Sequence, residues 1–276
     1  MRFKARVLPD KATLFQRVVS TVLQISKECV IHLTQTKMQF ILAAEITEGG
    51  MQVWSGIASN CLFEDYAIES LNNNEIAFEI SLDHLQRALK SGQDASEMLF
   101  KLVKKNGVPY LSFVIEKQGQ QTMSIVQDVP ISMLTQVQFS SYIEPHLPDP
   151  DVQIMMPPLK ILRNVIDKMK NVGEYLSIWA NMAGEIRFKV ESDMVTIQTS
   201  YRNLDHPQIE GKSPPRVNPE LEAEGKVRVK QFSKFLYSYQ VLPNNVVCCI
   251  VEGKAVVIHI LLDDLYMTYY IPMVVL

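Results

Sequence analysis

The sequence lacks the features that mark membrane-spanning and secreted proteins. No apolar run reaches the roughly 18 residues that a bilayer span requires, and the mean hydropathy is +0.03. The first ten residues, MRFKARVLPD, carry charge within the first six and show neither an apolar core nor a small-residue cleavage site. We therefore expect no membrane segment and no secretion signal.

Cysteine is scarce and is not spaced for metal binding. Cys29, Cys61, Cys248 and Cys249 form no CxxC pair and have no histidine at a metal-ligand interval. Each lies in or beside an apolar segment, which predicts reduced thiols in or near the core of an intracellular protein. We expect no metal site.

Familiar catalytic patterns are also missing. Asp263 and Asp264 are adjacent, so in a strand their side chains point to opposite faces and do not form a dyad. The five histidines are scattered, and neither GxGxxG nor GxxxxGK[ST] occurs. Residues distant in the sequence could still meet in space, but the sequence predicts a protein that is not an enzyme and that needs no cofactor.

What the sequence does contain is a set of amphipathic basic helices. Between Pro157 and Val172 the apolar residues fall on one half of a helix, whereas Lys160, Arg163 and Lys170 fall on the other. Asp167 lies among these cations, where it could either tune contacts with an anion or pair locally. A solvated surface is the simplest interpretation of one such helix taken alone.

Charge is concentrated on four such helices. The segments Lys11 to Lys27, Ser81 to Ser91, Leu159 to Asn171 and Lys230 to Gln240 together carry a net charge of +9, although the whole chain carries −3. In the last of them we expect Phe232, Phe235, Leu236 and Tyr239 to face inward. The rest of the chain is therefore acidic, and the positive electrostatic potential is concentrated on the basic helices.

The order of predicted elements occurs twice. Strand, helix, strands, strand, helix, strands runs through residues 1–131 and again through residues 152–276, and a proline-rich linker at residues 132–151 separates them. Apolar residues in the linker predict that it lies against the body. We expect an α+β fold of two similar domains, each with two helices packed on antiparallel sheets.

This arrangement predicts contact with phosphates. Sheets that cover one side of each helix leave the basic sides facing outward along a shared surface. The sequence shows no aromatic stripe for base stacking and no helix-turn-helix spacing, so such a surface would meet phosphates without reading bases.

The sequence resembles the sliding DNA clamps. The resemblance covers essentially the whole chain and includes the strand KMQFIL, the connection LPDPDV, the helix PLKILRNVIDKMKNV and the C-terminal YIPM. Within the clamps the chain is most similar to the Hus-type subunits of the heterotrimeric nine-one-one checkpoint clamp. The resemblance implies a PCNA-like fold in which three subunits form a ring, with helices lining the hole and sheets forming the outer shell.

The same resemblance implies a function. The chain would be a non-catalytic subunit of a heterotrimeric ring that acts in the nucleus, encircles double-stranded DNA at damage sites and recruits checkpoint and repair proteins. Its implied partners are two other clamp subunits, an ATP-driven clamp loader and DNA of any sequence.

The resemblance also implies site residues. Those facing DNA would be Lys11, Arg17, Lys27, Arg87, Lys90, Lys160, Arg163, Lys170, Lys230 and Lys234. Subunit contacts would use edge strands at Tyr110 to Glu116 and Tyr175 to Ala180, with the interface residues Leu111, Phe113, Ile115, Leu176 and Ile178. A partner groove would be formed by Met38, Phe40, Tyr142, Ile143, Leu147, Ile271 and Pro272.

Two other functions fit the residue chemistry. One is a homotrimeric PCNA-type processivity clamp for DNA polymerase, which would use the same weak, salt-screened phosphate contacts. The other is a protein scaffold that does not contact DNA and whose basic helices are merely solvated.

Overall fold

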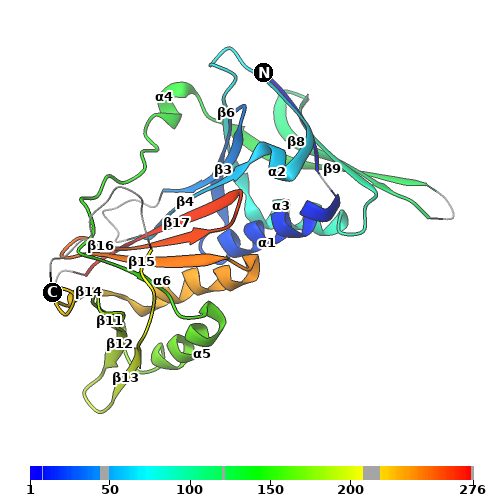
Figure 1. Ribbon diagram of the computed structural model, residues 1–276. Coiled ribbons are helices and arrows are strands. Elements are labelled where there is room, and N and C mark those ends of the chain that lie inside the picture. Colours follow the sequence, from blue (N-terminus) through cyan, green and yellow to red (C-terminus); the bar gives the residue numbers. More distant parts are fainter. Residues whose placement is uncertain (8, 44–49, 120–121, 208–217, 275–276) are drawn as a thin grey trace. The chain divides into compact units, whose positions relative to one another are not determined.

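The computed structural model describes residues 1–7, 9–43, 50–119, 122–207 and 218–274. The chain forms two compact units (Figure 1), one comprising Met1–Leu42 with Trp54–Ile143 and the other Ala43–Val53 with Glu144–Leu276. No helix among the described residues is long and apolar enough to cross a membrane.

The first unit places two main helices on a sheet. Its strands are β1 (Arg2–Val7), β2 (Glu28–Leu33), β3 (Lys37–Leu42), β4 (Gln52–Ala58), β5 (Phe63–Glu69), β6 (Ile76–Ser81), β7 (Glu97–Lys105), β8 (Val108–Lys117) and β9 (Met123–Met133). They follow the order β4-β3-β2-β6-β9-β8-β7-β1-β5. Its helices are α1 (Ala12–Leu23) after the 3₁₀ turn η1 (Pro9–Lys11), α2 (Ser59–Leu62), α3 (Leu82–Ser91) and α4 (Gln136–Phe139).

An aromatic cluster holds α1 on the sheet of the first unit. The ring of Phe15 is fully buried, and its centroid lies 6.0 Å from that of Phe40 on β3 and 5.6 Å from that of Phe100 on β7. Phe63 closes the cluster at 6.5 Å from Phe15. The apolar face of α1 is therefore fixed inward, and this sets the direction of its polar face.

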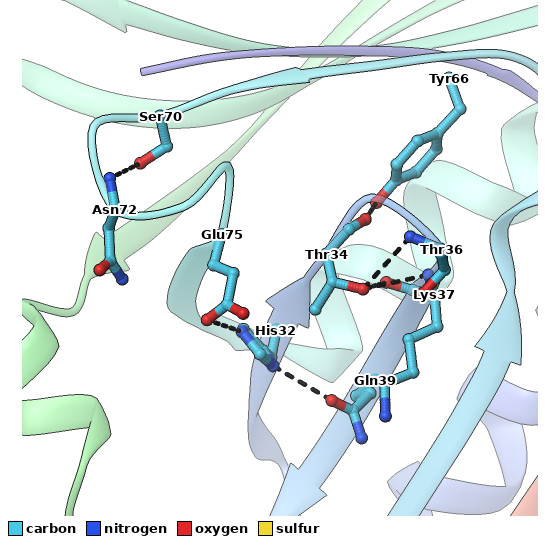
Figure 2. A network of polar contacts seen from close by, with 9 residues as sticks. All are labelled: His32, Thr34, Thr36, Lys37, Gln39, Tyr66, Ser70, Asn72 and Glu75. Carbon is cyan, nitrogen blue, oxygen red and sulfur yellow. Dashed lines mark hydrogen bonds and ion pairs between the residues drawn. The ribbon is translucent and has the colours of Figure 1, made fainter.

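Polar contacts fix the turn between β2 and β3 (Figure 2). The hydroxyl oxygen of Thr34 accepts hydrogen bonds from the backbone N–H groups of Thr36, at 3.4 Å, and Lys37, at 3.2 Å. The phenol of Tyr66 donates to the carbonyl of Thr34 at 2.7 Å, and burial raises the Tyr66 pKa. The turn is thus tied to β5, far from it in sequence.

The start of the predicted linker lies on the first unit. The His32 ring packs at a tilt against Phe139 of α4, with centroids 4.3 Å apart. Its Nε2 lies 3.3 Å from a carboxylate oxygen of Glu75 (Figure 2). Tyr142 stacks on Phe139 and donates its hydroxyl to Glu79 at 3.1 Å. The prediction that this segment lies against the body is confirmed for its first half.

The second unit repeats the order of elements. Its strands are β10 (Val152–Met155), β11 (Tyr175–Ala180), β12 (Ile186–Glu191), β13 (Thr196–Tyr201), β14 (Ala223–Arg228), β15 (Asn245–Val251), β16 (Ala255–Leu261) and β17 (Leu265–Pro272). They form the strand orders β10-β15-β16-β17 and β13-β12-β11-β14. Its helices are α5 (Leu159–Met169) and α6 (Val229–Phe235), and α6 continues as the 3₁₀ helix η3 (Leu236–Val241).

Aromatic residues also hold α6 in place. The ring of Phe232 packs against Phe188 of β12 with centroids 5.7 Å apart, and Phe235 packs against Tyr269 of β17 at 5.8 Å. The buried hydroxyls of Ser238 and Tyr269 lie 2.6 Å apart. One short helix thereby contacts both strand sets of this unit.

The second half of the linker lies on the second unit. The phenol of Tyr270 donates to Glu144 at 2.9 Å, and Leu147 packs against the buried residues Val247 and Val257. A carboxylate oxygen of Asp151 accepts from the backbone N–H of Glu252 at 2.9 Å. The prediction that the linker lies against the body is therefore confirmed for its second half as well.

The α+β prediction is confirmed, with differences at element ends. The helix expected from Lys11 to Lys27 ends at Leu23, and the helix expected from Lys230 to Gln240 changes to 3₁₀ geometry at Leu236. Cys29, Cys248 and Cys249 are buried free thiols, as predicted, and Cys61 is partly buried. Burial raises the pKa of Cys249 to about 12, which keeps this thiol protonated at neutral pH.

Candidate nucleic-acid interface

In the first unit, α1 and α3 lie side by side (Figure 1). The side-chain amide of Gln86 donates to the hydroxyl of Ser20 at 2.9 Å and joins the two helices. Leu85 and Leu89 of α3 are buried, so Arg87 and Lys90 are exposed on its opposite side. On α1, Arg17 is half-buried.

Two predicted cations of this unit lie outside the helices proper. Lys11 occupies the N-cap position of α1, where the helix dipole disfavours a cation. Lys27 follows the end of α1 and is exposed, and its carbonyl accepts a hydrogen bond from the N–H of Leu82 at 2.7 Å. Lys27 therefore lies at the start of α3, and the prediction that it belongs to the first helix is wrong.

In the second unit, the exposed face of α5 carries two lysines. Leu162 and Ile166 are buried, and Lys160, Asn164 and Lys168 are exposed on the far side. The sequence prediction did not include Lys168, although its position eight residues after Lys160 places it 80° away on a helix, on the same outward half. On α6, Lys230 and Lys234 are exposed.

Asp167 pairs locally with two of the predicted DNA-facing cations. One of its carboxylate oxygens lies 2.7 Å from Nζ of Lys170, and the other lies 3.5 Å from Nε of Arg163. These are i,i+3 and i,i+4 pairs on one helix face, and the side chains of Arg163 and Lys170 are only 25% and 30% exposed. The choice left open by the sequence is thus resolved in favour of local pairing.

Arg163 is also held by two tyrosines of η3. Its guanidinium carbon lies 4.0 Å from the ring centroid of Tyr237 and 5.4 Å from that of Tyr239. Its Nη1 donates to the Tyr239 hydroxyl at 3.2 Å. The sequence prediction places Tyr239 on the inward face of a continuous helix and links neither tyrosine to Arg163.

The predicted subunit-interface strands are not sheet edges. β8, which contains residues Tyr110 to Glu116, pairs with both β7 and β9, and β11 pairs with both β12 and β14. The side chains expected at the interface are at most 1% exposed: Leu111, Phe113, Ile115, Leu176 and Ile178. This prediction is wrong, because inward-facing residues of a central strand cannot reach a partner chain.

Other strands present open edges among the described residues. β9 lies between β6 and β8, but β6 meets only its end, Ile131 to Met133, so the stretch Met123 to Pro130 is paired on one side only. β13 ends the order β13-β12-β11-β14. The exposed side chains of Met123, Val126 and Val195 lie on or beside these edges.

The predicted partner groove is only partly accessible. Met38, Phe40 and Ile271 are at most 1% exposed, so the prediction that they line an open groove is wrong. Tyr142 and Pro272 are half-buried, and Ile143 is 72% exposed. Leu147, in contrast, lines a pocket of about 910 Å³ within the second unit.

That pocket is lined by the linker and by residues of β10, β15 and β16. Leu147, Met155, Val247 and Val257 supply apolar surface, while Glu144, Asp149, His146, His206 and His259 supply polar groups. Burial lowers the pKa of His259, and the neighbouring Glu144 carboxylate opposes this shift. The pocket therefore combines an apolar floor with an acidic and imidazole-bearing wall.

Comparison with known proteins places the chain in one family. The Hus1-like protein family matches residues 1–275. The checkpoint protein hus1 homolog of Dictyostelium discoideum is 39% identical over 277 residues, covering 100% of this chain and 99% of that protein. Checkpoint protein HUS1 of Homo sapiens is 32% identical over 279 residues, covering 99% of both chains.

A solved structure shows the same fold. The Proliferating Cellular Nuclear Antigen from Entamoeba histolytica superposes with a TM-score of 0.75 over 99% of each chain, at 15% sequence identity. The fold is therefore PCNA-like, as predicted. From the family match over residues 1–275 and the two relatives above 30% identity, we conclude that the chain belongs to the Hus1-like family.

Proposed function

We propose that this chain is a non-catalytic subunit of a heterotrimeric checkpoint clamp that acts in the nucleus. Membership of the Hus1-like family supports the checkpoint role, and the PCNA-like fold supports a clamp of several subunits. In this proposal the ring encircles double-stranded DNA at damage sites, a separate ATP-driven loader opens and closes it, and its outer surface recruits checkpoint and repair proteins.

The observation that carries the DNA part of the proposal is the distribution of exposed cations. In the first unit they stand on the exposed face of α3, and in the second unit on the exposed faces of α5 and α6: Arg87, Lys90, Lys160, Lys168, Lys230 and Lys234. Flexible lysines contact phosphates without reading base edges, and such contacts are screened by salt. Encirclement replaces tight binding, so weak contacts suffice and permit sliding.

The open strand edges are the natural positions for subunit contacts. An unpaired edge can add a strand from a partner chain and so extend the sheet across the joint. We assign this role to the Met123 to Pro130 stretch of β9 and to β13, in place of β8 and β11. We assign recruitment of partner proteins to the pocket beneath Leu147.

Assembly can be tested directly. We expect the chain, co-expressed with candidate clamp subunits, to co-purify with two of them at equal stoichiometry. Alone, it should associate weakly because its edges lack partners. A stable ring formed by this chain alone would favour the homotrimeric alternative, and a stable monodisperse monomer would count against the edge assignment.

DNA contact is tested by charge reversal in the assembled ring. Lys160→Glu or Lys168→Glu should weaken DNA retention, with the largest difference at low salt. Lys254→Glu is the matched control, because it makes the same charge change at an exposed lysine on the turn between β15 and β16. Equal retention by all three variants would support the scaffold that does not touch DNA.

A further inference from the structure

The side chain of Arg163 has more partners than those of the other cations on α5. The planar guanidinium stacks on Tyr237 at 4.0 Å and is bonded to the Tyr239 hydroxyl at 3.2 Å. Asp167 lies beside its Nε at 3.5 Å. The side chains of Lys160 and Lys168, in contrast, have no hydrogen bond or ion pair within the described part of the chain.

These contacts leave some N–H donors of the Arg163 guanidinium without a partner. A guanidinium has five N–H donors in a fixed fork. Tyr239 takes one from Nη1, and Asp167 lies near Nε, whereas Nη2 makes no hydrogen bond to any described residue. The side chain is 25% exposed and its Nε is buried, so the donors that remain available are those of the terminal nitrogens.

We propose that Tyr237, Arg163 and Tyr239 form a preorganised binding site for a phosphodiester of the DNA backbone. This inference rests on the proposed function and deepens it. The free donors of Arg163 bind the phosphate oxygens, and the two tyrosines act as positioning residues that hold the guanidinium in place. The surrounding lysines attract DNA, whereas Arg163 supplies a contact of fixed geometry.

Physical chemistry favours arginine for this task. Its fork matches phosphate geometry with two parallel hydrogen bonds, and stacking on an aromatic ring leaves the edge donors available. Because the side chain is already ordered, binding a phosphate costs little additional rotamer entropy. A lysine at this position would keep the charge but lose the fork.

The competing explanation is purely structural. Arg163 links α5 to η3, and the two tyrosines could serve only to pack these elements. That explanation predicts lower stability when the link is removed and unchanged DNA affinity. The phosphate-site proposal predicts a change in affinity that stability alone does not explain.

The test measures binding of the full chain to a short fluorescein-labelled duplex by anisotropy at several low salt concentrations. Arg163→Lys should weaken binding about fivefold, because the fork is lost, while the salt slope stays the same, because the charge is kept. Tyr239→Phe keeps the ring, removes the hydroxyl and should weaken binding about twofold. Thermal unfolding of each variant reports its stability.

A double-mutant cycle tests positioning. Tyr237→Leu should weaken binding in the wild-type chain but have no further effect in the Arg163→Lys background, since it acts through the guanidinium. Additive losses would overturn the positioning role. Unchanged affinity in Arg163→Lys and Tyr239→Phe, with a lower melting temperature, would leave only the structural link.

The result also separates this inference from the proposed function. If Lys160→Glu weakens DNA binding and Arg163→Lys does not, the phosphate site is wrong and DNA contact stands. If neither variant changes binding, the proposed DNA contact fails as well.

Discussion

The two units present positive charge in different ways. In the first, α1 and α3 are joined by a neutral bond between Gln86 and Ser20, and the exposed cations Arg87 and Lys90 have no ion pair among the described residues. In the second, Asp167 neutralises part of the charge of α5, and tyrosines of η3 fix Arg163.

The two arrangements suit different tasks: one attracts DNA over a distance, and the other contacts a phosphate in a fixed position. Unpaired side chains contribute to a long-range field and adapt to any phosphate that passes. A paired and stacked arginine contributes less net charge but has a defined direction. In a clamp built as proposed, the first unit would mainly attract DNA, whereas the second would also hold a preferred backbone position.

The largest expected effect tests whether the hydrophobic cores of the two units contribute equally to stability. Phe15→Ala and Phe232→Ala each remove a fully buried ring at the centre of an aromatic cluster. Each should lower the free energy of unfolding by about 3–5 kcal/mol, measured by urea denaturation. Thr13→Ala, an exposed change on α1, serves as control. A much smaller loss in one unit would show that its core is not equivalent.

A smaller effect distinguishes the turns of the two units. Gly107 and Gly184 both have positive φ, 84° and 90°, but a Cβ at Gly184 would lie 2.8 Å from the carbonyl oxygen of Leu204, whereas nothing lies within 4 Å at Gly107. Gly107→Ala should cost about 1–2 kcal/mol of strain, and Gly184→Ala should cost more. Equal losses in urea denaturation would show that the Gly184 turn moves freely to relieve the contact.

The difference in charge pairing itself is tested at Asp167. Asp167→Asn should raise DNA affinity about threefold, because it releases Lys170 and removes a negative charge near the phosphates. Tyr237 and Tyr239 still hold Arg163 in this variant. Binding is measured by anisotropy at low salt.

The matched control for that variant is on the first unit. Asp83→Asn makes the same charge change on α3, where the carboxylate has no ion pair within the described residues. It should raise DNA affinity less than Asp167→Asn does. An equal rise would mean that only net charge matters and that the local pairing of Asp167 has no separate effect.

The helix faces could be predicted from the sequence, because helical periodicity is local. Leu162 and Ile166 are buried and Lys160 is exposed, as the pattern on α5 indicates, whereas Ile161 is 57% exposed although the pattern places it on the apolar half. The same periodicity also predicts that Lys168 is exposed, because its helical angle places it on the same side as Lys160. The repeated order of elements, and with it the fold class, followed from these local patterns.

Strand edges and the Arg163 site could not be predicted in this way. Whether β8 or β9 is an edge depends on pairing between segments distant in sequence, and alternation within a strand carries no information about its neighbours. Tyr237 and Tyr239 reach Arg163 because the helix changes to 3₁₀ geometry at Leu236, which alters the direction of every later side chain.

The smallest expected effect concerns a histidine of the second unit. His32 in the first unit faces the carboxylate of Glu75, whereas Nδ1 of His259 lies 3.2 Å from the hydroxyl of Thr268, and burial lowers the His259 pKa below 6.5. The unfolded chain therefore takes up this proton as pH falls through about 6.5, before the folded chain does.

Stability should consequently fall as the pH is lowered through that range, and part of the loss should disappear in His259→Gln. Urea midpoints at about pH 7.5 and 5.5, compared between the wild type and the variant, measure this contribution. The other histidines are the same in both proteins, so any contribution from them cancels in the comparison. Identical pH dependence in the two proteins would contradict a depressed His259 pKa and would indicate that the Glu144 carboxylate offsets the effect of burial.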